Sequence, residues 1–213
     1  GDIFVGSGQQ WLSLTKAGGL FKFINTWKLA GNINIKISSD LNETGVNYLY
    51  GANLNNYEVK IVPATAGIKT ITNSIDLPNP LISIWQTTSP FSIDGSFNGI
   101  GKNLKFVCAS TTNNSNSLLS TISIFLNAST VGLKNCIWQS NNNYPLGGTI
   151  ELNTLSNIGG TIFFENNIVE NISSHPLATG SPRNGLFINS GGNLIMKNNE
   201  IINLLNKLNK LIN

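Results

Sequence analysis

The sequence is poor in charge. Charged residues make up 11% of its 213 residues, whereas an average soluble domain has about 25%. The net charge is only +3, and the 12 Lys and one Arg are spread along the chain without forming a basic cluster. We therefore expect no nucleic-acid partner. The chain also lacks any run of about 18 apolar residues, so we expect no transmembrane helix.

The groups that catalytic and metal sites need are also sparse. The chain has ten acidic residues and a single His. It contains no adjacent Asp pair, no nucleophile-elbow string, no Gly-rich phosphate loop and no HExxH motif. From these patterns we predict no catalytic residue, no metal site and no cofactor.

Asparagine is the residue that the chain has in abundance. There are 34 Asn and 21 Gly, while hydrophobic residues still amount to 40%. The chain can therefore bury a core and does not have the composition of a disordered polar tract. A surface of uncharged amides and hydroxyls is typical of secreted proteins, so we expect the protein to be secreted or displayed at the cell surface.

Short apolar runs alternate with polar residues from residue 32 onward. Residues 32–37 read Asn-Ile-Asn-Ile-Lys-Ile, with every Ile on one face of an extended chain. Similar runs follow, each bounded by Gly, Asn, Ser or Pro, and this punctuation predicts an all-β protein. The runs are residues 57–62, 68–71, 81–85, 91–94, 103–108, 122–126, 132–138, 149–152, 161–164, 185–188 and 193–196.

Internal repeats favour a solenoid over a sandwich. Residues 104–110 (LKFVCAS) are similar to 133–140 (LKNCIWQS), and residues 164–172 (FENNIVENI) are similar to 196–203 (MKNNEIIN). Repeats of about 30 residues with two or three short strands each predict a parallel β-helix, here of about six coils. Asn is expected at the coil corners because it tolerates left-handed backbone angles.

A helical pattern precedes the strands. Within residues 13–30, the side chains of Leu20, Phe21, Ile24 and Trp27 follow helical spacing, and Gly31 stops the pattern. We predict a helix whose heavy apolar stripe, with Phe21 and Trp27 as its largest side chains, covers another part of the fold.

A second helical stripe ends the sequence. Residues 200–213 place Ile and Leu on one face, with Lys207 and Lys210 opposite. A C-terminal helical cap is the favoured interpretation. A membrane-surface or partner-binding helix and a boundary inside a longer β-helix are the alternatives.

Three stretches resemble a known group of proteins. They are residues 13–45, residues 57–67 (YEVKIVPATAG) and residues 91–107 (FSIDGSFNGIGKNLKFV). They are similar to secreted β-helix proteins of Bacteroidota, within the broad pectate-lyase-like group of right-handed parallel β-helices. The resemblance covers residues 11 to 203 and implies a single β-helix domain over 1–213, with its coils at 32–203. It also implies that the predicted helix caps the open end of the first coil, with Phe21, Ile24 and Trp27 facing the core. It specifies architecture rather than chemistry, because this fold carries lyases, hydrolases, adhesins and stalks alike.

A polysaccharide lyase or glycoside hydrolase is the enzymatic alternative. Its site would lie in a groove that holds several of the few ionisable groups. Asp76 and Asp94 each follow an Ile, a context that is more typical of turn corners than of a Ca²⁺ site. Glu151 and Glu165 are expected on one face of successive strands. The single His and the single Arg share one predicted loop. These candidates are Asp76 and Asp94 at corners, Glu151 and Glu165 on strands, and His175 and Arg183 in the loop.

Aromatic residues are the stronger candidates for ligand binding. Trp85 and Trp138 each precede a Gln in similar contexts, and Tyr144 follows nearby. Exposed rings on a flat β-helix face can stack on sugar rings, while Asn and Gln bond the hydroxyls. The alternative is that both Trp rings pack in the coil. Polysaccharide or cell-surface glycan is therefore the expected partner.

Two cysteines, Cys108 and Cys136, lie about one predicted coil apart. Stacked at equivalent positions, their Cα atoms would be about 4.8 Å apart, within the range that a disulfide bridges. Two reduced, buried thiols fit the sequence equally well.

We expect a non-enzymatic β-helix: an adhesin, a stalk or a structural segment that contacts polysaccharide. A lyase or hydrolase is the alternative. Self-assembly into filaments, by end-to-end stacking of coils, is a further one.

Overall fold

A computed structural model of the protein describes residues 1–73, 79–87, 89–109, 120–126, 129–141, 148–154, 160–172, 184–189 and 192–202. The described strands form three sheets, here named A, B and C, and paired strands within each sheet are parallel. This pairing confirms the predicted solenoid, because a sandwich of hairpins would pair its strands antiparallel.

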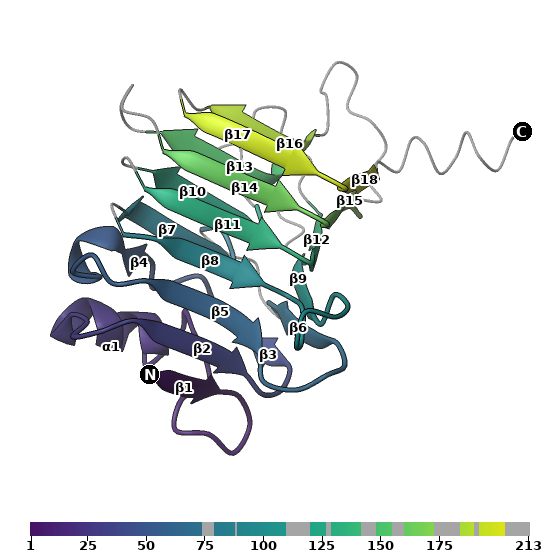
Figure 1. Cartoon of the computed structure of the whole chain (residues 1–213). Helices are drawn as coiled ribbons and strands as arrows, with labels where there is room; N and C mark the ends of the chain where they lie inside the picture. The colour runs from purple at the N-terminus through teal and green to yellow at the C-terminus, as the bar shows by residue number, and fades with distance from the viewer. Residues whose placement is uncertain are drawn as a thin grey trace, which may run out of the picture.

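Each sheet stacks one strand from every complete turn of the chain (Figure 1). Sheet A holds β1 (Asp2–Val5), β2 (Ile33–Ile37), β5 (Val59–Pro63), β8 (Phe91–Asp94), β11 (Thr130–Lys134), β14 (Thr161–Glu165) and β17 (Asn193–Lys197). Sheet B holds β3 (Leu41–Asn42), β6 (Lys69–Thr72), β9 (Leu104–Cys108), β12 (Cys136–Ser140), β15 (Ile168–Asn171) and β18 (Glu200–Ile202). Sheet C holds β4 (Leu49–Tyr50), β7 (Ile82–Thr87), β10 (Ile122–Leu126), β13 (Gly148–Thr154) and β16 (Asn184–Asn189).

The chain passes through sheets A, B and C in that order on every complete turn. In the described residues, five turns carry all three strands, from β2 to β16. The first turn has β1 and a helix, and the last has β17 and β18. The solenoid is therefore close to the length of about six coils that the repeats predict.

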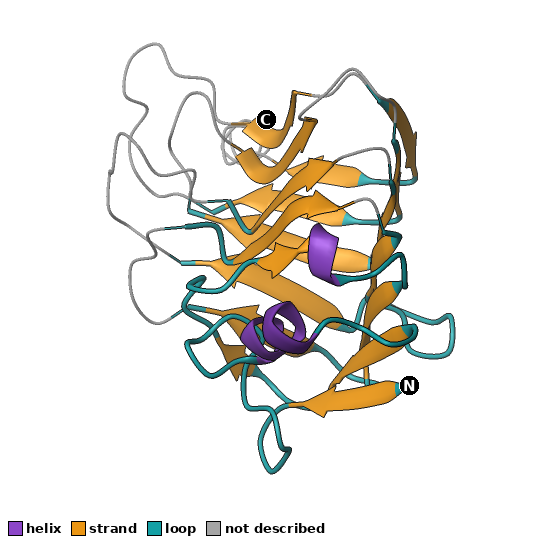
Figure 2. Cartoon of the chain, turned by 90° about the vertical axis from the view of Figure 1, so that its left-hand side faces the viewer, coloured by secondary structure: helices purple, strands orange, loops and turns teal. Residues whose placement is uncertain are grey.

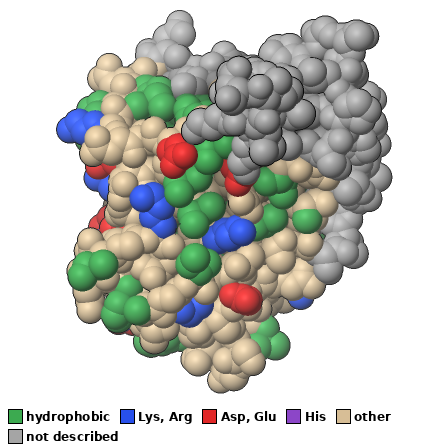
Figure 3. All heavy atoms as spheres, turned by 90° about the vertical axis from the view of Figure 1, so that its right-hand side faces the viewer, with side chains coloured by type: hydrophobic (Ala, Val, Ile, Leu, Met, Phe, Trp, Pro, Cys, Tyr) green, Lys and Arg blue, Asp and Glu red, His purple; other side chains and the backbone are tan. Residues whose placement is uncertain are grey.

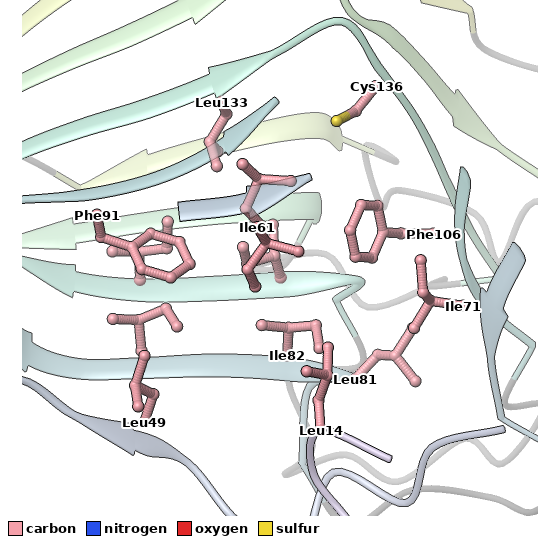
Figure 4. Packing of buried hydrophobic residues seen from close by; sticks show 14 of the residues in the cluster. Leu14, Leu49, Ile61, Ile71, Leu81, Ile82, Phe91, Phe106, Leu133 and Cys136 are labelled. Atoms are coloured by element: carbon pink, nitrogen blue, oxygen red, sulfur yellow. The ribbon is translucent and has the colours of Figure 1, made fainter. Parts of the chain in front are cut away.

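The core is built from stacked rows of inward side chains, and most strands contribute two or three of them (Figure 4). In sheet A, the register aligns Ile35 with Ile61, Ile61 with Ile93, and Leu133 with both Ile93 and Phe164. All five side chains are fully buried. The alternation of apolar and polar residues in the sequence is thus the alternation between the core and the outer face of each sheet.

Asparagine forms the corners between sheets A and B, as expected. Asn135, Asn166 and Asn198 follow β11, β14 and β17, and their φ angles are 55°, 54° and 52°. Asn adopts this left-handed conformation more readily than most residues. The corner amides also bond along the axis, because Asn166 Nδ2 donates to Asn135 Oδ1 at 2.6 Å. The same donation runs from Asn135 to Asp94 Oδ1 at 2.8 Å.

The N-terminal helix, α1 (Leu20–Trp27), is shorter than the predicted span of 13–30. It lies at the N-terminal end of the solenoid next to β4 (Figures 1 and 2). Leu20, Phe21 and Ile24 are buried as predicted, but the prediction for Trp27 is wrong, since 71% of its surface is exposed. Trp27 is the last helical residue, and the chain turns at Lys28 with a φ of 57°.

Glu200–Ile202 forms strand β18 instead of the start of the helix predicted over 200–213. Residues 203–213 lie outside the described residues. Among the described residues, no helix has the length and hydropathy to span a membrane.

Candidate functional site

Trp138, one of the predicted ligand-binding residues, belongs to the core. Its side chain is fully buried and stacks on Phe106, with ring centroids 4.5 Å apart and planes at 14°. Its Nε1 donates to Asn167 Oδ1 at 3.1 Å. The prediction of a binding role for Trp138 is therefore wrong, because no face of the ring reaches solvent. Tyr144 lies outside the described residues.

Trp85 does point outward, from β7 on sheet C, and is half-buried. It joins Phe125 on β10, at 4.4 Å between ring centroids, and Tyr48, at 6.3 Å. Tyr50 pairs with it in register from β4. The Phe125 ring is tilted by 39° against that of Trp85, and both residues are half-buried. This column therefore contributes packing along the axis and is not a flat platform for a sugar.

The two acids predicted on strands, Glu151 and Glu165, do not share one face. Asp94 and Glu165 lie on sheet A, but Glu151 lies on sheet C, so the expectation that Glu151 and Glu165 share a face is wrong. Successive strands in sequence belong to different sheets of a solenoid, which is the physical reason. Asp76, His175 and Arg183 lie outside the described residues.

Glu151 is fully buried on β13. Burial raises the pKa of its carboxyl to about 7, although Ser120, Gly148 and Ser123 partly oppose the effect. Among the described residues, neither carboxylate oxygen accepts a hydrogen bond of ordinary geometry.

Cys108 and Cys136 are both buried, and neither forms a disulfide. The register of β9 and β12 pairs Cys136 with Leu104 and Cys108 with Ser140, at opposite ends of the two strands. The stacking that would favour a disulfide is therefore absent.

The outer face of sheet A carries a hollow that we name the sheet A notch. The register aligns four outward positions across the sheet: Lys60 with Ser92, Ser92 with Gly132, and Gly132 with Phe163. The two middle residues are small, whereas Lys60 below and Phe163 above are large. The notch between them has a volume of about 270 Å³, and Glu58, Asp94, Thr130 and Lys134 also line it.

Gly132 forms the floor of the sheet A notch. A Cβ atom at this position would lie 3.4 Å from Ser92 Cβ and 3.7 Å from Lys134 Cε, which is ordinary contact. The backbone therefore does not require glycine here. What glycine provides is open space in the middle of the column.

Charged groups of both signs surround the notch. Lys60 Nζ lies 4.0 Å from Asp94 Oδ2, which is too far for a hydrogen bond. Both groups therefore keep hydrogen-bonding capacity for a ligand. Lys134 Nζ lies 2.7 Å from Glu165 Oε2 and 5.3 Å from the centroid of the Phe163 ring.

Asp94, which lines the notch, and Glu165, which pairs with Lys134, are held in the ionised form. Burial alone would raise the pKa of Asp94, but hydrogen bonds from Asn135 and Ser96, together with the charge of Lys60, lower it below its ordinary value. The hydrogen bond from Lys134 lowers the pKa of Glu165. The notch thus offers ammonium donors, carboxylate acceptors, the hydroxyls of Ser92 and Thr130, and one aromatic wall.

The outer face of sheet B is on the side of the molecule that Figure 3 shows. Lys and acidic side chains are interspersed there with hydrophobic ones, and Gln139 Nε2 donates to Glu170 Oε2 at 2.8 Å. Among the described residues, no group of three or more His, Cys, Asp or Glu is placed to hold a metal ion.

No protein-family model, curated protein or solved structure matches the chain significantly. These comparisons lend no support to the pectate-lyase-like and Bacteroidota resemblance, so the solenoid architecture rests on the structure itself.

Of the residues that line the notch, only Asp94 stands out as a candidate in the sequence. The alternation of apolar and polar residues in each strand indicates which residues point outward, and it identifies Ser92 and Gly132 as small outward residues. Their alignment is hidden because the turn between them is long: Phe91 pairs with Val131, 40 positions later, whereas Val59 pairs with Phe91 after 32.

Proposed function

We propose that the protein is a non-enzymatic, extracellular or cell-surface β-solenoid that binds polysaccharide in the sheet A notch. The observation that carries the proposal is the outward column in which Ser92 and Gly132 leave a hollow between Lys60 and Phe163. A volume of about 270 Å³ is near the lower end of small-molecule sites, about 300 Å³. One sugar ring of a longer chain therefore suits the notch.

The polar groups of the notch match a hydroxyl-rich ligand. Lys60 and Asp94 stand 4.0 Å apart, as a donor and an acceptor that do not bond each other directly. Neighbouring hydroxyls of a sugar can bond to both groups, because a hydroxyl donates and accepts at once. The apolar face of the ring can contact Phe163, whose π-system attracts C–H groups.

The ionisation of Asp94 and Glu165 favours a role in binding over a role as the general acid of glycoside hydrolysis. A hydrolase needs one carboxylic acid that stays protonated near neutral pH. The pKa values of Asp94 and Glu165 are both lowered, so neither acid can supply that proton. The low charge and the Asn-rich surface support an extracellular location, and the resemblance to Bacteroidota β-helix proteins makes a bacterial source part of the proposal.

A substitution that fills the notch tests the proposal. Gly132→Val places two methyl groups in the hollow at a position where a Cβ fits. The fold should persist, since β-branched residues favour strands. Thr70→Val is the matched control, because Thr70 points outward from β6 on another sheet.

Native gel electrophoresis through xylan, mixed-linkage glucan, polygalacturonate and alginate would measure binding. We expect at least one polymer to retard the wild type and Thr70→Val equally, and Gly132→Val to bind about tenfold more weakly or worse. Light scattering should show that the bound polymer keeps its length. Equal retardation of all three proteins would exclude the notch, and a shortened polymer would support the enzymatic alternative.

A further inference from the structure

The N-terminal end of the solenoid exposes a cluster of large aromatic side chains. Trp27 is 71% exposed and Phe23 is 44% exposed. Trp11 and Phe23 have ring centroids 5.0 Å apart, and Phe23 and Trp27 have centroids 6.4 Å apart. We name this row of three rings the aromatic ridge.

Two rings of the ridge, Phe23 and Trp27, are not needed to close the core, whereas Trp11 packs partly against it. Helix α1 already buries Leu20, Phe21 and Ile24 against the first complete turn. Phe23 and Trp27 lie one helical turn apart and remain exposed. Water-exposed rings gathered in one place are typical of a surface that binds something.

Two hollows flank the ridge, and Trp11 and Phe23 line both of them. The first has a volume of about 410 Å³ and is also lined by Phe4, Gln9 and Gln10. The second has a volume of about 290 Å³ and reaches Lys22, Thr26 and Trp27. The ridge is therefore a wall between two concave surfaces, each of a size suited to one or two sugar rings.

The polar groups of these hollows are mostly uncharged. Gln9 and Gln10 are exposed amides, and Thr26 adds a hydroxyl. Asp2, at the rim of the first hollow, already pairs with Lys36 at 2.5 Å and accepts from Asn34 at 2.9 Å. Lys22 is the one cation among the residues that line the two hollows. An anionic ligand would thus find little charge to pair with, whereas a neutral, hydroxyl-rich ligand finds both donors and acceptors.

We propose that the aromatic ridge is a second binding site, which takes a neutral oligosaccharide segment. The rings of Trp27, Phe23 and Trp11 provide π-faces and edges for the C–H groups of successive sugars. The amides of Gln9 and Gln10 bond their hydroxyls. The inference takes its ligand class from the proposed function but depends on a separate set of residues, since the ridge shares none with the sheet A notch.

Truncation of the ridge tests the site. Trp27→Ala and Phe23→Ala remove exposed rings without opening the core, because neither residue belongs to the buried cluster. Leu12→Ala is the matched control: Leu12 is 66% exposed but does not line either hollow. Titration calorimetry would use xylan, mixed-linkage glucan, galactomannan and dextran, with polygalacturonate as the anionic comparison.

We expect Trp27→Ala and Phe23→Ala each to weaken binding of at least one neutral polymer about tenfold, with Leu12→Ala unchanged. Unchanged affinity of Trp27→Ala and Phe23→Ala for every polymer would overturn the site. A ridge variant that changes the sedimentation coefficient of the protein but not its affinity for any polymer would also overturn the site, since that result would assign the ridge to self-association.

The two proposed binding sites can be rejected independently of each other. Loss of binding in Trp27→Ala with full binding in Gly132→Val would support the ridge and reject the notch. The opposite pattern would reject the ridge and leave the proposed function in place.

Discussion

A single buried amide, that of Asn167, joins three turns of the solenoid. Its Oδ1 accepts from Cys136 N and from Trp138 Nε1, both at 3.1 Å, and its Nδ2 donates to Leu133 O at 2.8 Å. On the other side, Asn199 Oδ1 accepts from Asn167 N at 2.9 Å. Because Asn167 is 1% exposed, water cannot replace these bonds.

Asn167→Ala should therefore destabilise the fold strongly. The substitution leaves two donors and one carbonyl buried without partners, at a cost of about 3 kcal/mol or more in the free energy of unfolding. Urea denaturation followed by Trp fluorescence measures this cost. Asn193→Ala, an exposed position at the start of β17, should change it by less than about 0.5 kcal/mol. Equal stabilities of the two variants would contradict the role of Asn167.

Glu151 should make stability fall as the pH rises. Its pKa is about 7 in the folded protein against an ordinary value of 4.5, so folding favours the protonated form. This contribution is complete below about pH 4.5 and is lost as the pH rises through about 7. The difference corresponds to about 3 kcal/mol.

The measurement is the free energy of unfolding at pH 5 and pH 8.5, for the wild type and for Glu151→Gln. The Gln side chain keeps the shape without the charge, so the variant should lose about 2.5 kcal/mol less than the wild type between the two pH values. The same pH dependence in both proteins would show that Glu151 does not ionise with this penalty.

At the scale of elements, the N-terminal cap is fastened by a buried carboxylate. Glu43 follows β3 and is fully buried. Its Oε1 accepts from Leu14 N at 2.8 Å, and its Oε2 accepts from Thr15 N at 2.8 Å and Thr15 Oγ1 at 2.7 Å. These bonds fix the segment that leads into α1.

Glu43→Gln should loosen the cap while leaving the later turns intact. The new amide NH₂ must face a backbone N–H or a hydroxyl that previously donated, so at least one buried donor loses its partner, at about 2 kcal/mol. Hydrogen exchange should accelerate at Leu14 and Thr15, with little change in β11 and β14. Glu58→Gln, an exposed substitution, is the control. Uniform acceleration along the chain would mean that the cap is not a local unit.

The elements were predictable to the extent that local pattern determines them. Ile-x-Ile alternation correctly indicated the inward residues, and the Asn-Asn strings at 166–167 and 198–199 mark real corners. The exposure of Trp27 could not be predicted from its spacing. Trp27 follows Leu20 at helical spacing and so falls on the apolar face, but its exposure depends on where α1 ends. The partners of the cysteines were hidden for a related reason. Cys136 pairs with Leu104, 32 positions earlier, so an offset of 28 places Cys108 at the other end of the strand.

At the scale of the whole molecule, side chains far apart in sequence meet only through the register of the turns. Fold class follows from repeats of about 30 residues, since any such period stacks strands. The notch depends on the lengths of individual turns, which vary from 26 residues between Ile33 and Val59 to 40 between Phe91 and Val131. A site formed by side chains from several turns is therefore harder to predict from the sequence than the strands of each turn.

Two sites on one rigid solenoid should cross-link a polymer that each can bind. Linked binding raises the apparent affinity when both sites can be occupied. We expect the wild type to increase the scattering of a shared polysaccharide, such as mixed-linkage glucan. Gly132→Val and Trp27→Ala should each still bind but no longer cross-link. Cross-linking by either single variant would contradict the bivalent arrangement.

The most direct test of the central claim is a residue-resolved NMR titration. The ¹⁵N-labelled protein would be titrated with an oligosaccharide prepared from the polymer that retards it most strongly. The account predicts concentration-dependent shifts of the Ser92, Gly132 and Lys134 amides, which lie on adjacent strands of sheet A. Shifts confined to sheet C around Trp85, or none at saturating ligand, would contradict the sheet A notch as the polysaccharide site.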